Sequence, residues 1–428
     1  MFSAHLGRNV DFHGTDVTKP TIDEQVALLM QGTEYGDAAL ASAMETELRE
    51  RLVEADRESR PLRVYCGFDP RTADLHIGHM VPIRKMRQFQ ELGHEVTFLI
   101  GRFTSLVGDP SHEDKVRAQI TMEEATKNAE TYTEQAFAIL DPDKTRIRYN
   151  DEWLAPLTFE DLIHLSSHFT VQQFLSRESF RQRFDNEDPI YVHEFMYALM
   201  QSYDAYSLKT DVQIGGTDQL FNIITAARKL MEALGEKPNI GVILGILPGT
   251  DGVIKMSKSL GNHIPLNTTA EDMYGKVMSV PDKAMGEYMR LATRWGPSEI
   301  AKIEGDLAAG ESHPRDTKMM LAREIVEIYY GGEAASEAEK HFQQVFQQGG
   351  EPEDMDTFQL SGDTGLIDVM ANSGMVSSRS DARRLVKQGG VRLNDEVLED
   401  PNQDLVTAAG GVLRVGKRRF LKLLAADE

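Results

Sequence analysis

Apolar and polar residues alternate through the middle of the chain in a pattern that predicts strands and helices in turn. Between the predicted strands, apolar residues recur at helical spacing, as Met80, Ile83, Met86 and Phe89 do within 76–92. Strand–helix alternation of this kind predicts a Rossmann-like, doubly wound parallel sheet that binds ligands at the carboxyl ends of its strands. Short apolar runs predict buried strands at 63–68, 95–101, 145–149, 211–215 and 240–247.

The pattern changes character along the chain and predicts five regions. Residues 37–54 predict a helix, and Thr121 with Glu124 forms a capping box that opens a helix ending near Leu140. Another helix is predicted at 193–208 and one at 219–234, and the pattern from 269 to 346 is almost wholly helical. The predicted regions are an acidic helical extension (1–60), the α/β domain (61–268), a helical domain (269–347), a Gly- and Gln-rich linker (348–363) and a small α+β domain (364–428).

Composition restricts the class of protein. The chain has 428 residues, which predicts more than one domain. The single cysteine, Cys66, excludes an intramolecular disulfide and favours a reducing compartment. No apolar run approaches the roughly 18 residues of a membrane span, and the N-terminus resembles neither a secretory signal nor a transit peptide. We therefore expect a cytoplasmic protein without a membrane partner.

Charge is distributed unevenly. The whole chain has a formal net charge of −22, which by itself argues against a nucleic-acid partner. Residues 365–428, however, carry +1, with ten Lys and Arg in two clusters, 379–392 and 414–422. The small domain therefore has either an RNA-binding face or a merely solvated basic surface.

Two distant motifs could bind phosphate. His76-Ile77-Gly78-His79 opens a predicted helix, where unpaired N–H groups and the helix dipole attract anions. Lys255 and Lys258 lie in a glycine-flanked loop that could close over a polyphosphate. The alternatives are a structural or metal-binding histidine pair and a basic surface loop. No third ligand stands at a metal-site spacing, so no metal site is expected.

Polar residues on a helix and on a turn could form a pocket wall. Tyr197, Gln201 and Asp204 are spaced by four and three, which places them on one helix face, although a solvated face would show the same spacing. A Gly216-Thr217-Asp218-Gln219 turn follows a predicted strand, and Asp218 could equally be a helix N-cap.

Taken together, these motifs resemble the class I aminoacyl-tRNA synthetases, and the longer ones look like bacterial tyrosyl-tRNA synthetases. The similarity runs from about Arg63 through Lys258. It resumes at 378–394, which looks like the RNA-binding module of a small-subunit ribosomal protein (ribosomal-protein-S-four-like). The segments that carry the core resemblance are Tyr65-Cys66-Gly67-Phe68-Asp69-Pro70, Leu75-His76-Ile77-Gly78-His79, Gly108-Asp109-Pro110-Ser111, Gln201-x-Tyr203-Asp204 and Gln213-Ile214-Gly215-Gly216-Thr217-Asp218-Gln219.

The resemblance implies a role for each matched residue. The catalytic residues would be His76, His79, Lys255 and Lys258. The tyrosine phenol would meet Tyr65 and Asp204, and its ammonium and carboxylate would meet Asp69, Asp109, Tyr197, Gln201 and Gln219. ATP would contact the catalytic four together with Cys66, Gly67, Gly78, Gly216 and Asp218. Transfer RNA would bind Arg379, Arg383, Arg384, Lys387, Arg392, Lys417 and Arg418.

The implied function is tyrosine–tRNA ligation in two steps, with ATP–Mg²⁺ as a substrate complex and no tightly bound cofactor. The implied partners are L-tyrosine, ATP, the tRNA for tyrosine and a second copy of the chain. The alternatives are a tryptophanyl-type synthetase, a nucleotidyltransferase of another pathway and a non-catalytic, synthetase-derived RNA-binding regulator. The chain departs from the family pattern at Arg71 and at His112-Glu113.

Overall fold

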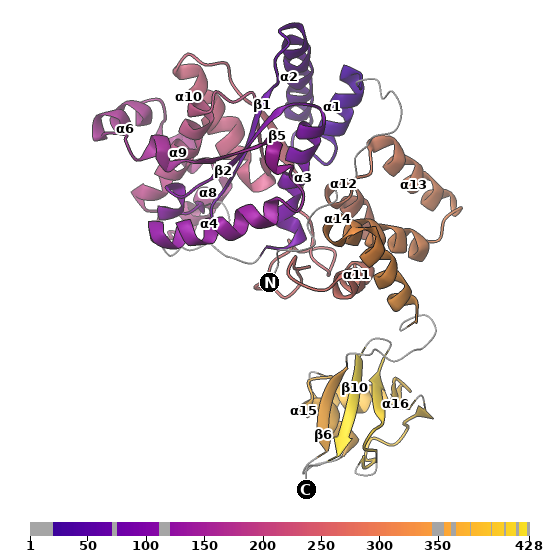
Figure 1. Ribbon diagram of the computed structural model, residues 1–428. Coiled ribbons are helices and arrows are strands. Elements are labelled where there is room, and N and C mark those ends of the chain that lie inside the picture. Colours follow the sequence, from indigo (N-terminus) through magenta and orange to yellow (C-terminus); the bar gives the residue numbers. More distant parts are fainter. Residues whose placement is uncertain are drawn as a thin grey trace. The chain divides into compact units, whose positions relative to one another are not determined.

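The chain forms two compact units, Met1–Ala335 and Ser336–Glu428, which are described separately below (Figure 1). This computed structural model describes residues 20–70, 75–110, 120–344, 355–360, 365–376, 378–394, 396–405, 408–416 and 419–425.

A five-stranded sheet with the order β3-β2-β1-β4-β5 forms the centre of the first unit. Every neighbouring pair of strands is parallel, which confirms the predicted doubly wound sheet. The strand order reverses between β1 and β4, and in sheets of this type ligands bind in the crevice at that point. The strands are β1 (Arg63–Phe68), β2 (Glu95–Ile100), β3 (Thr145–Tyr149), β4 (Val212–Gly216) and β5 (Ile240–Leu244).

Helices flank this sheet and continue beyond it (Figure 1). Within the described ranges, no helix is both long enough and apolar enough to cross a membrane. The helices are α1 (Ile22–Met30), α2 (Ala38–Arg57), α3 (Ile77–Glu91), α4 (Met122–Ala136), α5 (Asp151–Leu154), α6 (Phe159–Ser166), α7 (Val171–Leu175), α8 (Glu178–Asp185), α9 (Val192–Ser207), α10 (Arg228–Ala233), α11 (Ala270–Ser279), α12 (Met285–Ala292), α13 (Pro297–Ala309) and α14 (Pro314–Phe342). Shorter turns of helix are η1 (Thr104–Leu106), η3 (Pro142–Lys144), η4 (Thr217–Gln219), the π-helix η5 (Phe221–Ala227) and η6 (Asp282–Ala284).

Hydrophobic periodicity located α3 correctly, and the capping box located the start of α4. The apolar stripe of α3 is fully buried against the sheet. Thr121 and Glu124 make both capping-box hydrogen bonds, but α4 ends at Ala136 rather than near Leu140. Strand β5 ends at Leu244 rather than at 247, because the next amide, that of Gly245, donates to the Gly32 carbonyl at 2.9 Å.

The helix predicted at 219–234 begins irregularly, as η4 and then η5, before α10. Glycines on two strands allow η5 to lie close to the sheet. A Cβ atom on Gly215 would lie 2.6 Å from Ile223 Cδ1, and one on Gly241 would lie 2.4 Å from Ile224 Cδ1. A π-helix is rare and is most often found at functional sites.

The N-terminal segment covers the edge of the sheet at β5. The Glu34 amide donates to the Ile243 carbonyl at 2.7 Å, and the Tyr35 hydroxyl donates to the Gly241 carbonyl at 2.7 Å. An uncovered edge strand can pair with other chains, so this cover protects the fold. On α2, Arg51 Nη1 lies 3.0 Å from Oδ1 of the buried Asp211, next to the start of β4.

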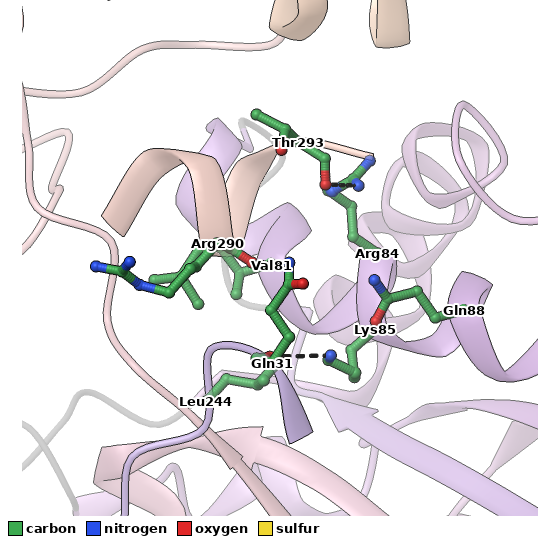
Figure 2. Close-up of a pocket in the computed structure, with 9 residues that line it drawn as sticks. Gln31, Val81, Arg84, Lys85, Gln88, Leu244, Arg290 and Thr293 are labelled. Atoms are coloured by element: carbon green, nitrogen blue, oxygen red, sulfur yellow. Dashed lines mark hydrogen bonds between the residues drawn. The ribbon is translucent and has the colours of Figure 1, made fainter. Parts of the chain in front are cut away.

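A small polar pocket lies between this extension, α3 and α12 (Figure 2). The Lys85 ammonium donates to the carbonyls of Leu28 and Gln31, at 2.9 and 3.0 Å, where the C-terminal end of α1 favours a cation. Arg84 donates to the carbonyl of Thr293. The cavity has a volume of about 10 Å³, which is room for about one water molecule. The described part of the predicted extension is therefore packed into the first unit.

The second unit is a small α+β domain, as predicted. Its five-stranded sheet has the order β6-β10-β9-β7-β8, and Leu366, Val369, Leu413 and Leu423 are among its fully buried residues. The elements are β6 (Asp356–Leu360), α15 (Leu366–Asn372), α16 (Arg379–Lys387), β7 (Val391–Leu393), β8 (Glu396–Val397), β9 (Val412–Val415) and β10 (Arg419–Ala425).

The prediction of a linker at 348–363 is wrong in one respect, because this range contains strand β6. This strand pairs in parallel with β10, from Asp356 opposite Leu421 to Leu360 opposite Ala425. Three of its five side chains are exposed, so its sequence is too polar to be recognised as a strand. The partner strand that stabilises it lies more than 60 residues further along the chain.

We expect Gly241→Ala to lower the free energy of unfolding by about 1–3 kcal/mol, because the new methyl group would overpack Ile223 and Ile224. Chemical denaturation followed by circular dichroism measures this change. Gly305→Ala on α13 is the matched control, since its Cβ would enter open space, and it should stabilise the protein by about 0.4–1 kcal/mol. Equal effects of the two substitutions would contradict the packing argument.

Candidate functional site

The candidate site lies at the carboxyl ends of β1 and β4, where the strand order reverses. Three groups of predicted residues meet near this edge: those that follow β1 and β4, those on α9, and those on the first turn of α3. The loop that follows β5 carries the two predicted lysines toward the same edge, since Lys255 Nζ lies 4.0 Å from Asp218 Oδ2.

A buried hydroxyl and a buried carboxylate form one part of the candidate site. Tyr65 on β1 is 1% exposed and donates to the Gln201 carbonyl at 3.5 Å. Asp204 accepts from Trp153 Nε1 at 2.7 Å and from Asn150 Nδ2 at 3.3 Å. Burial raises the pKa of Asp204 to about 7, even though both donors favour its ionised form. This part of the pocket suits a ligand hydroxyl, which can both donate and accept.

Asp69, just after β1, lies in the same pocket. It accepts from Thr104 Oγ1 at 2.7 Å and from the Tyr197 hydroxyl at 3.0 Å. Burial, followed by the charges of Asp69 and Asp109, raises the pKa of Tyr197 well above its ordinary value. Tyr197 is therefore a neutral donor, and it holds the carboxylate of Asp69 in one orientation.

Asp109 is held from two sides. Its Oδ1 accepts from Arg177 Nη2 at 2.9 Å, and its Oδ2 accepts from Gln219 Nε2 at 2.5 Å. Gln219 in turn accepts from Asn222 Nδ2 at 3.0 Å. Close by on α9, Gln201 Oε1 is buried and has no hydrogen-bond partner among the described residues. Carboxylate and amide oxygens in this arrangement suit a cationic N–H donor.

The two histidines form the start of α3. The His76 amide donates to His79 Nδ1 at 3.2 Å, and the ring centroids are 3.8 Å apart. Burial, with smaller contributions from nearby charged groups that include Lys255, lowers the pKa of His76 to about 3 and that of His79 to about 4. Both imidazoles are therefore neutral at neutral pH, and they present N–H donors beside the partial positive charge of a helix N-terminus.

Gly78 leaves room for the His76 ring and lies next to the lysine loop. A Cβ atom on Gly78 would lie 3.0 Å from His76 Nδ1 and 3.6 Å from the Cβ atom of Met256, which is buried. Asn262 fastens the loop, since its Nδ2 donates to Asp251 Oδ2 at 2.6 Å and its Oδ1 accepts from the Ser257 amide at 2.8 Å. Both predicted lysines, Lys255 and Lys258, are exposed on this fastened loop.

The remaining predicted nucleotide residues lie on the two strand ends. Cys66 is buried, and burial raises the pKa of its thiol, whereas Gly67 is exposed. A Cβ atom on Gly216 would lie 2.5 Å from Asp218 Oδ1, so a side chain there would displace the carboxylate of Asp218. Asp218 lies inside η4 and is not the N-cap of a helix, so that alternative is wrong.

Several residues of the pocket are not in the predicted set. Asn150 directly follows β3, so the rule that ligand-site residues follow strands could have found it. Trp153 lies on α5 and Thr104 on η1, whereas Arg177 is the N-cap residue of α8. No periodicity or motif indicates these three residues. Asn262 follows a glycine in the lysine loop and carries no signal of its own.

In the second unit, four predicted RNA-binding residues share one face of α16. Arg379, Arg383, Arg384 and Lys387 are exposed, whereas the opposite face of α16 is buried. Arg379 Nε lies 2.6 Å from Asp368 Oδ1, and Arg384 pairs with Asp381. Arg392 is exposed on β7. Six residues named earlier lie outside the described residues: Arg71, Ser111, His112, Glu113, Lys417 and Arg418.

The lowered pKa values of His76 and His79 predict a loss of stability in mild acid. Between pH 6.5 and about 4 the unfolded chain binds protons that the folded chain does not, so the free energy of unfolding falls as the pH falls. We expect about 1 kcal/mol of loss for each histidine between pH 7 and 5.5. NMR titration measures the pKa values of the two imidazoles, with the urea-unfolded chain as the control, and urea denaturation at pH 7 and 5.5 measures the loss of stability. A midpoint near pH 6.5 in the folded protein would contradict the prediction.

Comparison with known proteins identifies the family of the first unit and of the small second domain. The family model described as tRNA synthetases class I (W and Y) matches residues 57–347, and the S4 domain model matches residues 364–407. A tyrosine–tRNA ligase of Moorella thermoacetica is 44% identical over 403 residues, which cover 94% of this chain and 97% of that protein. One of Thermotoga maritima is 44% identical over 378 residues, covering 88% of this chain and 94% of that protein.

Solved structures share the fold at low sequence identity. A truncated mitochondrial tyrosyl-tRNA synthetase of Aspergillus nidulans has a TM-score of 0.59 and 23% identity, and the match covers 76% of this chain and 93% of that chain. The tyrosyl-tRNA synthetase of Archaeoglobus fulgidus in complex with L-tyrosine has a TM-score of 0.56 and 22% identity, over 74% of this chain and all of that chain. The chain therefore belongs to the class I tRNA synthetases of the W and Y family.

Proposed function

We propose that this chain is a tyrosyl-tRNA synthetase. It joins L-tyrosine to ATP, giving tyrosyl-adenylate and pyrophosphate, and then transfers tyrosine to the 3′ end of its tRNA. The observation that carries the proposal is the cluster of buried polar side chains between β1 and α9, in which Tyr65 and Asp204 lie near the carboxylates of Asp69 and Asp109. The tyrosine–tRNA ligases that match almost the whole chain support it.

The phenol of the substrate is recognised by Tyr65 and Asp204. Both are buried, so a substrate without a hydroxyl would place an apolar ring edge against two polar groups and would forgo the hydrogen bonds that a phenol can add. Trp153 and Asn150 hold Asp204 in place and so fix where the hydroxyl binds. Phenylalanine is therefore rejected, and tryptophan presents an N–H donor of different position and shape.

The ammonium of the substrate is held by Asp109, Tyr197 and Gln201. The buried Oε1 atom of Gln201 gains a donor when the ammonium arrives. Asp69 and Gln219 surround the amino and carboxylate groups through their contacts with Tyr197 and Asp109. These side chains place the carboxylate of tyrosine so that it can attack a phosphate.

Adenylate formation requires alignment and charge stabilisation rather than proton transfer. The tyrosine carboxylate is ionised at neutral pH, so it attacks the α-phosphate of ATP without a general base. His76 and His79 donate neutral N–H groups, and Lys255 and Lys258 supply positive charge as pyrophosphate leaves. The nucleotide lies near Cys66, Gly67, Gly78, Gly216 and Asp218. Magnesium arrives with ATP as part of the substrate complex, and the enzyme needs no resident cofactor.

The enzyme works in the cytoplasm, binds the tRNA for tyrosine through the basic face of α16, and is a homodimer. Large apolar side chains are exposed on the segment from α6 to α9, which is typical of a surface that a second protein covers. A second copy of the chain is the occupant that we propose. The most exposed of these side chains are Phe159, Val192 and Phe184, at 77%, 75% and 62%.

Exchange of labelled pyrophosphate into ATP tests the activity. We expect exchange with tyrosine and at most traces with tryptophan or phenylalanine. Lys258→Ala should slow the exchange by roughly 10²-fold and leave the tyrosine dissociation constant within about twofold, because Lys258 contacts phosphate only. Lys302→Ala, which removes an exposed lysine of α13, is the control. Exchange with tryptophan alone, or a large loss of tyrosine binding in Lys258→Ala, would contradict the assignment.

Arg383→Ala combined with Lys387→Ala should separate tRNA binding from amino-acid activation. Both residues are exposed on α16, in a unit that does not contain the candidate site. We expect normal pyrophosphate exchange, weaker tRNA binding, and a slope of log affinity against log salt that is less steep by about one to two units. Full aminoacylation at limiting tRNA would show that α16 does not bind the tRNA.

A further inference from the structure

We propose that Arg177 is a positioning residue for substrate recognition, and that its guanidinium holds the carboxylate of Asp109 in the correct orientation for the α-ammonium of the amino acid. The inference deepens the proposed function and rests on it. Arg177 belongs to none of the motifs described above and lies 68 residues from Asp109 along the chain.

The contact between the two side chains is short and buried. Arg177 Nη2 lies 2.9 Å from Asp109 Oδ1, and the side chains are 4% and 11% exposed. Gln219 holds the other oxygen of the same carboxylate at 2.5 Å. These donors, one on each oxygen, set the plane of the carboxylate.

Aromatic rings hold Arg177 in turn. The central guanidinium carbon lies 5.7 Å from the ring centroid of Phe180 and 5.8 Å from that of Phe221. Cations are attracted to ring faces at this range, and a planar guanidinium stacks there better than an ammonium does. Because Phe180 belongs to α8 and Phe221 to η5, Arg177 links two elements to the carboxylate that follows β2 and η1.

A comparison with Asp204 shows why Asp109 needs a cationic partner. Asp204 receives hydrogen bonds from the neutral groups of Trp153 and Asn150, and burial raises its pKa to about 7. That environment suits a neutral phenol hydroxyl. An ammonium is held by charge, and the guanidinium of Arg177 offsets the cost of burying the carboxylate of Asp109 that receives it.

Three ligands separate this role from a merely structural one. L-Tyrosine and tyramine both carry the ammonium, whereas 3-(4-hydroxyphenyl)propanoate has the phenol and the carboxylate but no ammonium. With Arg177→Met in the full chain, we expect the affinities for tyrosine and tyramine to fall by roughly 10- to 100-fold. Affinity for the propanoate should stay within about twofold. Equilibrium binding by calorimetry measures all three, and the KM for ATP should not change.

Conservative and control variants complete the test. Arg177→Lys keeps the charge without the planar fork and should restore part of the tyramine affinity. Arg183→Met removes another buried ion pair of α8, that with Glu194 at 2.6 Å, and should lower stability without changing the ratio of tyramine to propanoate affinity. If Arg177→Met does not fold, the same ratio is measured on Arg177→Lys and Arg177→Gln.

Two results would overturn the inference: equal weakening of all three ligands, or no weakening of tyramine. Failure of the proposed function has a different signature, since the unmodified protein would then neither bind tyrosine nor exchange pyrophosphate. The outcome for Arg177 is therefore read only from the variants, and the outcome for the function only from the wild-type protein.

Discussion

Strands β1 and β4 pair in parallel, with Val64 opposite Val212 and Tyr65 opposite Gln213. After β1 the chain continues to β2 on one side of this pair, and after β4 it continues to β5 on the other side. Parallel pairing puts both carboxyl ends on the same edge, and the reversal of strand order leaves a crevice there. Residues that follow β1 therefore meet residues that follow β4. Every contact in the pocket depends on this pairing, because α3, α9 and the lysine loop are positioned relative to these two strand ends.

The pocket places buried carboxylates in different environments to give them different tasks. Asp204 has neutral donors and suits a hydroxyl, whereas Asp109 has a guanidinium partner and suits an ammonium. The imidazoles of His76 and His79 are neutral at neutral pH because they are buried, so the positive charge near them comes from lysines on an exposed loop. Burial thus decides which of these groups carry charge, and under the proposed function the exposed lysines supply the charge that ATP meets.

Local patterns predicted the elements that are stabilised locally or by a simple buried face. The periodic apolar residues of α3 and the capping box of α4 required no knowledge of distant contacts. The π-helix η5 and strand β6 were not predicted. The close packing of η5 against Gly215 and Gly241 is a tertiary contact, and β6 pairs with β10, more than 60 residues further along the chain. The charge pattern located the basic face of α16, because that face lies on one continuous helix.

The sequence by itself determined the sheet, the order of its motifs, the histidine pair at the start of α3, the lysine loop and the acidic residues that follow strands, since short-range spacing and family resemblance encode these. Only the tertiary structure decided which side chains touch. The partnership of Arg177 with Asp109, the neutral donors around Asp204 and the packing of the N-terminal segment onto β5 all join residues more than 50 positions apart. Such contacts have no local signal, because their energy comes from desolvation and pairing that exist only after the chain has folded.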